Sequence, residues 1–96
     1  MIKHIVMWKL NEENKSANAK NIKEKLEALV GQIPGLLEVE VGIDFNKSEA
    51  AFDVVLYSVL ESKAALTAYQ IHPAHQAVVP VVKAAACQRV VVDYTI

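Results

Sequence analysis

Three segments of this chain are apolar on two opposite sides when they are read as strands. In residues 2–10 the even positions are apolar apart from His4, and the odd positions include Ile5 and Met7. Residues 52–60 and 88–96 have the same two-sided character and are rich in valine. Because successive side chains of a strand point to opposite faces, a strand with one solvated face would alternate apolar and polar residues. The sequence therefore predicts a sheet that is covered on both faces.

The segments between these strands predict one amphipathic helix and one further strand. Apolar residues recur at spacings of three and four in residues 22–33, which is typical of an amphipathic helix. We expect this helix to follow a loop or a fraying first turn at residues 11–16 and to end at Gly31, Pro34 and Gly35. Residues 37–45 alternate apolar and polar side chains and predict a strand with one buried face. A turn at residues 46–50 then joins this strand to residues 52–60 as a hairpin.

The second helical region is interrupted by Pro73. Ser62 is a candidate N-cap for a helix that ends near Ile71, because a proline at position 73 disfavours the helical conformation at the preceding residue. Proline is favoured at the first position of a helix, so a second helix is expected to begin there and to continue to about residue 86. Pro80 lies inside that helix and is expected to kink it or to restart it.

The predicted order is strand, helix, strand, strand, helix, strand. This order indicates an α+β fold of the ferredoxin-like β-α-β-β-α-β plan, with a four-stranded antiparallel sheet and the helices on one face. Residues 1–96 form a single domain in this interpretation. The uncovered face would still be apolar, and its simplest cover is the same face of a second copy. We therefore expect a homodimer through the sheet faces, a dimeric α+β barrel.

Composition narrows the classes of partner and location. Hydrophobic residues make up 53% of the chain, which is high for a single domain of 96 residues and agrees with a subunit interface. A net charge of −1 offers no basic surface for nucleic acid or for an anionic membrane. One cysteine, Cys87, allows no internal disulfide, and Met1 leads directly into strand-like sequence without a signal peptide. We expect a cytoplasmic protein with neither a nucleic-acid nor a membrane partner.

The side chains best suited to catalysis or ligand binding lie around Pro73. Tyr69, His72 and His75 place a phenol and two imidazoles in one short segment. His75 would lie in the first turn of the second helix, where the helix dipole disfavours a charged imidazolium and keeps the ring able to accept a proton. This makes His75 a candidate general base. His4 is the polar exception on an apolar strand face, and it is either a hydrogen-bonded histidine at the edge of the core or part of a pocket.

Metal binding and cysteine chemistry are not predicted. His72 and His75 are separated by three positions, but Pro73 interrupts the helix between them and no third ligand lies nearby in the sequence. No partner base can be named for Cys87, so we expect a small buried hydrophobic residue at this position. No cofactor is indicated.

Three segments together resemble the stress-responsive A/B barrel (Dabb) family. They are residues 4–10, the Tyr-Gln-Ile-His-Pro-Ala-His motif at 69–75 and the closing segment 90–94. The resemblance implies the dimeric α+β barrel as a separate line of support. The family includes plant stress proteins, bacterial members without an assigned activity, and a plant polyketide cyclase that closes a linear polyketide by aldol condensation without cofactor or metal.

The resemblance to the cyclase implies roles for three residues. His75 would take the proton next to a carbonyl, Tyr69 would hydrogen-bond the developing enolate or the acyl carbonyl, and His4 would help to hold the substrate. Two alternatives stay open beside this cyclase or lyase chemistry. In one, the residues have only structural roles, with His72 capping a helix end. In the other, they line a pocket that binds a small hydrophobic or carbonyl compound without chemistry, with Trp8 and His72 as further ligand contacts.

A third enzyme class shares the dimeric architecture. Cofactor-independent monooxygenases oxidise aromatic substrates in such barrels, and Trp8 with the apolar sheet could line a pocket of that kind. This interpretation depends on fold analogy, whereas the histidine motif points to the Dabb family.

Overall fold

Seven helices and strands follow one another in the computed structural model, which describes residues 1–96. They are β1 (Ile2–Leu10), α1 (Lys15–Glu27), β2 (Leu36–Ile43), β3 (Val54–Leu60), α2 (Lys63–Ile71), α3 (Pro73–Ala85) and β4 (Ala86–Thr95). This order confirms the ferredoxin-like plan, with the second helical region divided in two at His72 as the sequence predicts. None of the helices is both long and apolar enough to span a membrane.

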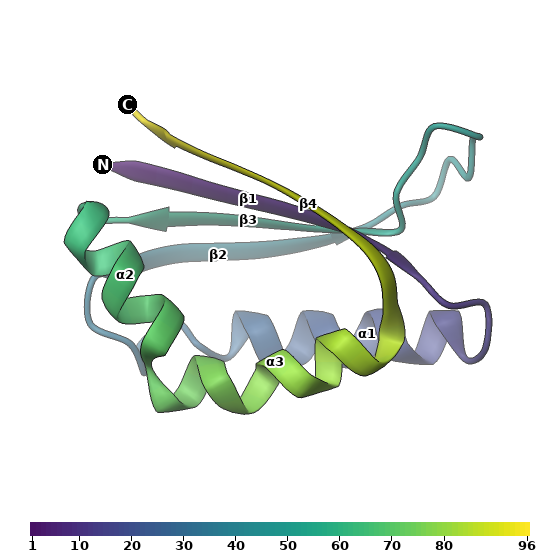
Figure 1. Cartoon of the computed structure of the whole chain (residues 1–96), viewed down its shortest axis with the longest axis horizontal. Helices are drawn as coiled ribbons and strands as arrows, with labels where there is room; N and C mark the ends of the chain where they lie inside the picture. Colours follow the sequence, from purple (N-terminus) through teal and green to yellow (C-terminus); the bar gives the residue numbers. More distant parts are fainter.

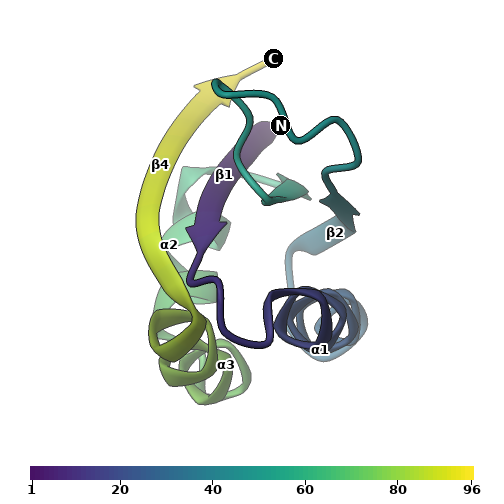
Figure 2. The ribbon, with the colours of Figure 1, turned by 90° about the vertical axis from the view of Figure 1, so that its right-hand side faces the viewer.

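The four strands form one antiparallel sheet in the order β2-β3-β1-β4. All three helices lie on the same face of this sheet, as Figures 1 and 2 show from two directions. β3 is central, as its two-sided pattern predicts, and β1 lies beside it. Val6 in β1 is opposite Leu56 in β3 and Val91 in β4, which fixes the register of the three neighbouring strands.

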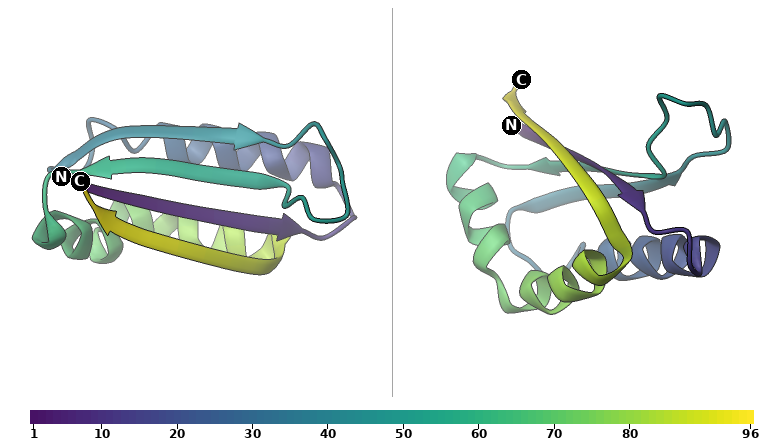
Figure 3. Two further views of the ribbon diagram at one scale, coloured as in Figure 1. Left: turned by 90° about the horizontal axis from the view of Figure 1, so that it is seen from above. Right: turned by 45° about the vertical axis from the view of Figure 1, so that its right-hand side comes forward.

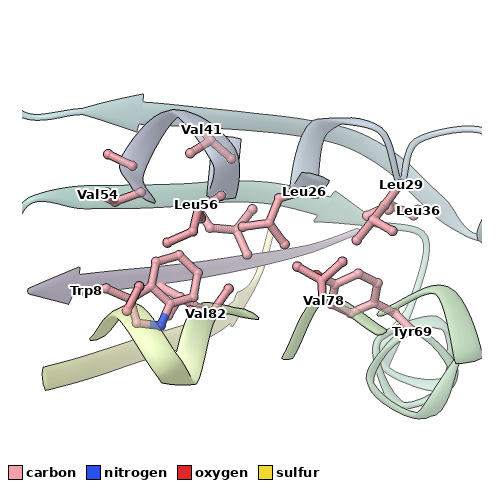
Figure 4. Packing of buried hydrophobic residues seen from close by; sticks show 14 of the residues in the cluster. Trp8, Leu26, Leu29, Leu36, Val41, Val54, Leu56, Tyr69, Val78 and Val82 are labelled. Atoms are coloured by element: carbon pink, nitrogen blue, oxygen red, sulfur yellow. The ribbon is translucent and has the colours of Figure 1, made fainter. Parts of the chain in front are cut away.

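The core lies between the sheet and the helices. The even positions of β1 are buried there, and Ile22 and Leu26 of α1 pack against them at 0% and 3% exposure. Figure 4 shows Trp8 and Val82 near one end of this cluster and Tyr69 with Val78 near the other. Side chains spaced by three and four along α1 and α3 thus meet side chains spaced by two along β1.

The first helix is shorter than its periodicity predicts. It begins at Lys15 and ends at Glu27, whereas the pattern placed its apolar positions between residues 22 and 33. Leu29 and Ile33 keep the same buried face from turns that follow the helix. Gly35 has a φ of 84°, and a Cβ at this position would lie 2.8 Å from the Cβ of Ala65. A larger residue at position 35 would therefore collide with α2.

Local signals set the ends of α2 and α3. The Ser62 hydroxyl accepts a hydrogen bond from the backbone N–H of Ala65 at 3.1 Å, so the predicted N-cap is confirmed. Nδ1 of His72 accepts from the N–H of Ala74 at 3.0 Å and caps α3 in the same way. Of the two outcomes expected at Pro80, a kink or a restart of the helix, the restart does not occur, because α3 runs on to Ala85. A proline removes a single backbone donor, and apolar contacts of Val78 and Val82 hold the helix on both sides of it.

Residues at the end of α3 also differ from the prediction. β4 begins at Ala86, two residues before the expected strand at residue 88. Cys87 was expected to be buried, and that expectation was wrong because its side chain is exposed. Its position near the start of an edge strand explains this, since only Ala86 of β4 is even partly buried.

The sheet face opposite the helices is open and largely apolar. Val90, Val92 and Tyr94 of β4 lie on it beside the odd positions of β1, and they are 46%, 61% and 41% exposed. The left view of Figure 3 looks onto this face and shows no helix in front of the strands. The two-sided apolar pattern of the sequence thus leaves one side uncovered within a single chain.

Candidate functional site

A cavity of about 280 Å³ lies between the sheet and the helices. Its wall is mostly apolar, with eight hydrophobic residues among twelve. It is lined by His4, Val6, Trp8, Leu26, Leu56, Tyr69, His75, Val78, Val79, Val82, Lys83 and Arg89. The fold therefore brings together four of the five residues that the sequence singles out, from β1, α2 and α3.

The Tyr69 hydroxyl is a buried donor without a partner. Tyr69 is in the last turn of α2, and its side chain is 1% exposed. Its hydroxyl oxygen is the one buried side-chain polar atom of the chain that makes no hydrogen bond. Burial raises the pKa of Tyr69 to about 12, against a smaller opposite effect of the positive charge of Arg89. The phenol therefore keeps its proton at neutral pH and can donate it into the cavity.

His75 places an imidazole against this phenol. The two ring centres are 4.4 Å apart, and Nδ1 of His75 is 3.1 Å from the backbone carbonyl of Gln70. Because a carbonyl oxygen only accepts, Nδ1 carries the hydrogen, and Nε2 of the neutral ring keeps a free lone pair. The pKa of His75 is lowered, chiefly by burial, with the charges of His4 and Arg89 acting in the same direction. Burial thus acts in the direction that the sequence analysis assigned to the helix dipole, toward the neutral ring.

His4 is held by an acid on the neighbouring strand. Its Nδ1 is bonded to Oδ1 of Asp93, which lies directly opposite it in the β1 and β4 register. A carboxylate oxygen accepts, so Nδ1 of His4 donates and its orientation is fixed. The ring is 3% exposed and meets the edge of Tyr69, with 6.0 Å between ring centres. His4 is therefore both a hydrogen-bonded histidine of the core and a wall of the cavity, which joins the two interpretations that its sequence position allows.

Trp8 and His72 have different positions relative to the cavity. Trp8 lines the cavity from β1. It lies two residues after Val6 and on the same face of the strand. His72 does not line the cavity, and its Nδ1 is used as the cap of α3. The structure gathers no group of three or more histidine, cysteine, aspartate or glutamate side chains that could hold a metal ion.

Sequence reasoning missed three charged residues of this site. Arg89 and Lys83 line the cavity, and Asp93 orients His4. A signal was available for two of them, because Arg89 and Asp93 share one face of β4 in an otherwise apolar run. The pairing that brings this face to His4 joins residues 89 positions apart, and no local pattern specifies it.

The lowered pKa of His75 predicts a pH dependence of stability. The unfolded chain binds this proton near pH 6.5, while the folded chain binds it only at lower pH. Stability rises with pH wherever the unfolded state binds more protons, so the free energy of unfolding should fall as the pH drops below about 6.5. We expect His75→Gln to weaken this fall, measured as melting temperatures between about pH 7 and pH 5.

A carboxylate provides the control for this prediction. The hydrogen bond from Lys23 and a backbone bond from Val41 hold the pKa of Glu27 below its usual value of 4.5. Its contribution is present above that value and is lost only as the pH falls below it. Glu27→Gln should leave the slope between pH 7 and pH 5 unchanged. Equal slopes for wild type and His75→Gln would contradict the assignment to His75.

Comparisons with known proteins show what the chain is similar to. A protein of Streptomyces coelicolor, itself uncharacterized, is 34% identical over 79 residues, which are 80% of this chain and 81% of that protein. A crystal structure of a dimeric protein of unknown function from Bacteroides fragilis superposes with a TM-score of 0.90 at 30% identity, over 99% of this chain and 95% of that one.

One similar structure is that of an enzyme. Hydroxynitrile lyase from Passiflora edulis is 20% identical, with a TM-score of 0.86 over 99% of this chain and 92% of the lyase. At that identity the likeness shows a common fold, and it is not evidence for a common activity. The profile of the Stress responsive A/B Barrel Domain matches residues 2–96. The fold, the site motif and this match agree, and the chain belongs to the stress-responsive A/B barrel (Dabb) family.

Proposed function

We propose that this protein is a homodimer whose cavity binds a compact, largely apolar compound that carries a carbonyl group. The observation that carries the proposal is the Tyr69 hydroxyl, which is buried at the cavity wall without a hydrogen-bond partner. Leaving such a group unpaired costs about 1–3 kcal/mol, and a ligand acceptor would recover that energy. A ligand carbonyl oxygen is an acceptor of this kind.

The rest of the cavity suits a small ligand of this class. Its volume of about 280 Å³ is close to the lower end of small-molecule sites, roughly 300 Å³. Val78, Val79 and Val82 of α3 offer apolar contacts to the body of the ligand. Tyr69 carries the one buried polar atom of this lining that has no partner, so the position of its hydroxyl would help to determine how the ligand is oriented.

Tyr69→Phe tests the proposal because it removes only the hydroxyl. We expect wild type to bind acetophenone more tightly than α-methylstyrene, which has the same shape with a methylene in place of the oxygen. The variant should lose that preference, a change of about fivefold or more in dissociation constant, measured by calorimetry. Without ligand, the variant should be more stable by about 1 kcal/mol, since a buried unpaired hydroxyl has gone.

Tyr94→Phe is the matched control. It removes a phenol hydroxyl from the open face of the sheet, outside the cavity. It should leave the preference for acetophenone unchanged. Equal binding of the two probes to wild type, or an unchanged preference in Tyr69→Phe, would show that the Tyr69 hydroxyl does not take part in ligand recognition. Native mass spectrometry of protein from its own host would identify any retained compound and count the subunits.

Cofactor-free acid–base catalysis is the second candidate function. The observation that favours it is a neutral imidazole next to a phenol that keeps its proton, both in one cavity. Nε2 of His75 would take a proton from the carbon next to the ligand carbonyl, and Tyr69 would donate a hydrogen bond to the enolate oxygen that forms. His4, fixed by Asp93, would help to hold the substrate.

The monooxygenase alternative predicts a different observable. It requires oxygen consumption with quinol-like aromatic substrates, for which Trp8 would offer a stacking surface. The paired histidine and tyrosine favour proton transfer over this chemistry. Absence of oxygen uptake across a panel of such substrates would eliminate it.

The homodimer would cover the open sheet face. Ile5 and Met7 of β1 and the valines of β4 present apolar side chains there, and contiguous exposed apolar surface of this kind marks interaction sites. The same face of a second copy is complementary to it under two-fold symmetry. The dimer would leave the cavity, which lies on the helix side of the sheet, free to take a ligand.

A further inference from the structure

Two cationic side chains line the cavity, and no acidic side chain does. Lys83 lies in the last turn of α3, and Arg89 lies on β4 opposite Trp8. Neither has an ion-pair partner in the chain. The ion pairs join His4 to Asp93, Lys15 to Glu12 and to Asp53, and Lys23 to Glu27.

The charge of Arg89 acts on the polar end of the site. It lowers the pKa of both Tyr69 and His75, so its guanidinium lies within electrostatic reach of both side chains. Asp93 is on the same face of β4, but its carboxylate is bonded to His4 and makes no ion pair with Arg89. The cavity therefore carries an excess of positive charge at its β4 and α3 side.

We propose that the bound compound carries a carboxylate in addition to its carbonyl group. The carbonyl would accept from Tyr69, the apolar body would lie against the valines of α3, and the carboxylate would meet Arg89 and Lys83. A guanidinium binds a carboxylate through two parallel hydrogen bonds, a geometry that lysine does not offer. This inference rests on the proposed function and narrows its ligand class to small keto acids.

The test compares two probes of nearly the same shape, one with an anionic end group and one with a neutral end group. 4-Acetylbenzoate and 4-acetylbenzamide share the ketone, the ring and the planar end group. By calorimetry, wild type should bind the carboxylate about tenfold more tightly than the amide. Arg89→Gln should abolish this preference, and Lys83→Gln should reduce it by a smaller factor. Neither side chain makes a hydrogen bond within the chain, and both are exposed, so we expect both variants to fold.

Lys20→Gln is the matched control, because it makes the same change in net charge at an exposed position of α1 away from the cavity. It should keep the preference for the carboxylate. Higher salt should weaken binding of 4-acetylbenzoate and leave the amide unaffected. Equal affinity of wild type for both probes would overturn the carboxylate inference and leave the carbonyl proposal in place. Failure of wild type to bind either probe would overturn both.

Discussion

Replacing His75 with alanine is expected to slow proton exchange next to a ketone by a factor of about 10²–10⁴. The assay is deuterium uptake by the methyl group of acetophenone in heavy water, followed by NMR, because it reports the proposed proton transfer without knowledge of the natural substrate. Nε2 of His75 takes the methyl proton, the electron pair of the C–H bond moves into the enolate, and a deuteron from solvent returns to the carbon. Without the imidazole of His75, the cavity loses the base that is assigned to this step.

The pH profile distinguishes a base from a structural histidine. The pKa of His75 lies below 6.5, so the ring is free to accept a proton at pH 7, and the exchange rate should fall only when the pH drops below that pKa. This acidic limb should be absent in His75→Ala. A structural histidine would change the melting temperature without producing such a limb.

Gln76→Ala provides the control for His75→Ala. Gln76 donates to the same Gln70 carbonyl at 2.7 Å, but it is exposed and does not line the cavity. The exchange rate should be unchanged in this variant. If wild type does not accelerate exchange, or if a folded His75→Ala protein exchanges at the wild-type rate, His75 is not a general base.

The fold was predictable because its signals are local. Alternation along residues 37–45 and two-sided apolar runs elsewhere follow directly from the geometry of a strand, and Ser62 and Pro73 mark helix starts by known backbone chemistry. The end of α1 was not predictable in this way. Leu29 and Ile33 are buried from turns, so their periodicity continued beyond the helix itself.

The site was predictable in part. Tyr69 and His75 are close in sequence, and a proline between them forces a change of chain direction that brings their rings together. His4 was visible as a polar residue on an apolar face. Arg89 and Asp93 reach the cavity only through the pairing of β1 with β4, and the register of strands at the two ends of a chain depends on the whole sheet. Burial, which lowers the pKa of His75, depends equally on tertiary packing.

Val92→Asp is expected to convert the homodimer into a monomer. Val92 lies on the open sheet face opposite Ile5 and is 61% exposed in the single chain, so an aspartate there is tolerated by the monomer. In a two-fold dimer both copies would place a carboxylate among apolar side chains without a partner. Burying two such groups costs about 4 kcal/mol or more, which is about a thousandfold in the dissociation constant. Sedimentation over a dilution series measures this change.

Val30→Asp separates the effect of the interface from that of the added charge. Val30 is 43% exposed, but it follows α1 in the helical layer, away from the open face. This variant should sediment as wild type does. If the wild-type protein is a stable monomer at micromolar concentration, the homodimer proposal is wrong. If Val92→Asp is still a dimer, the interface is not on the open sheet face. Because the cavity lies on the helix side of the sheet, a monomeric Val92→Asp that still binds acetophenone would show that each chain carries a complete site.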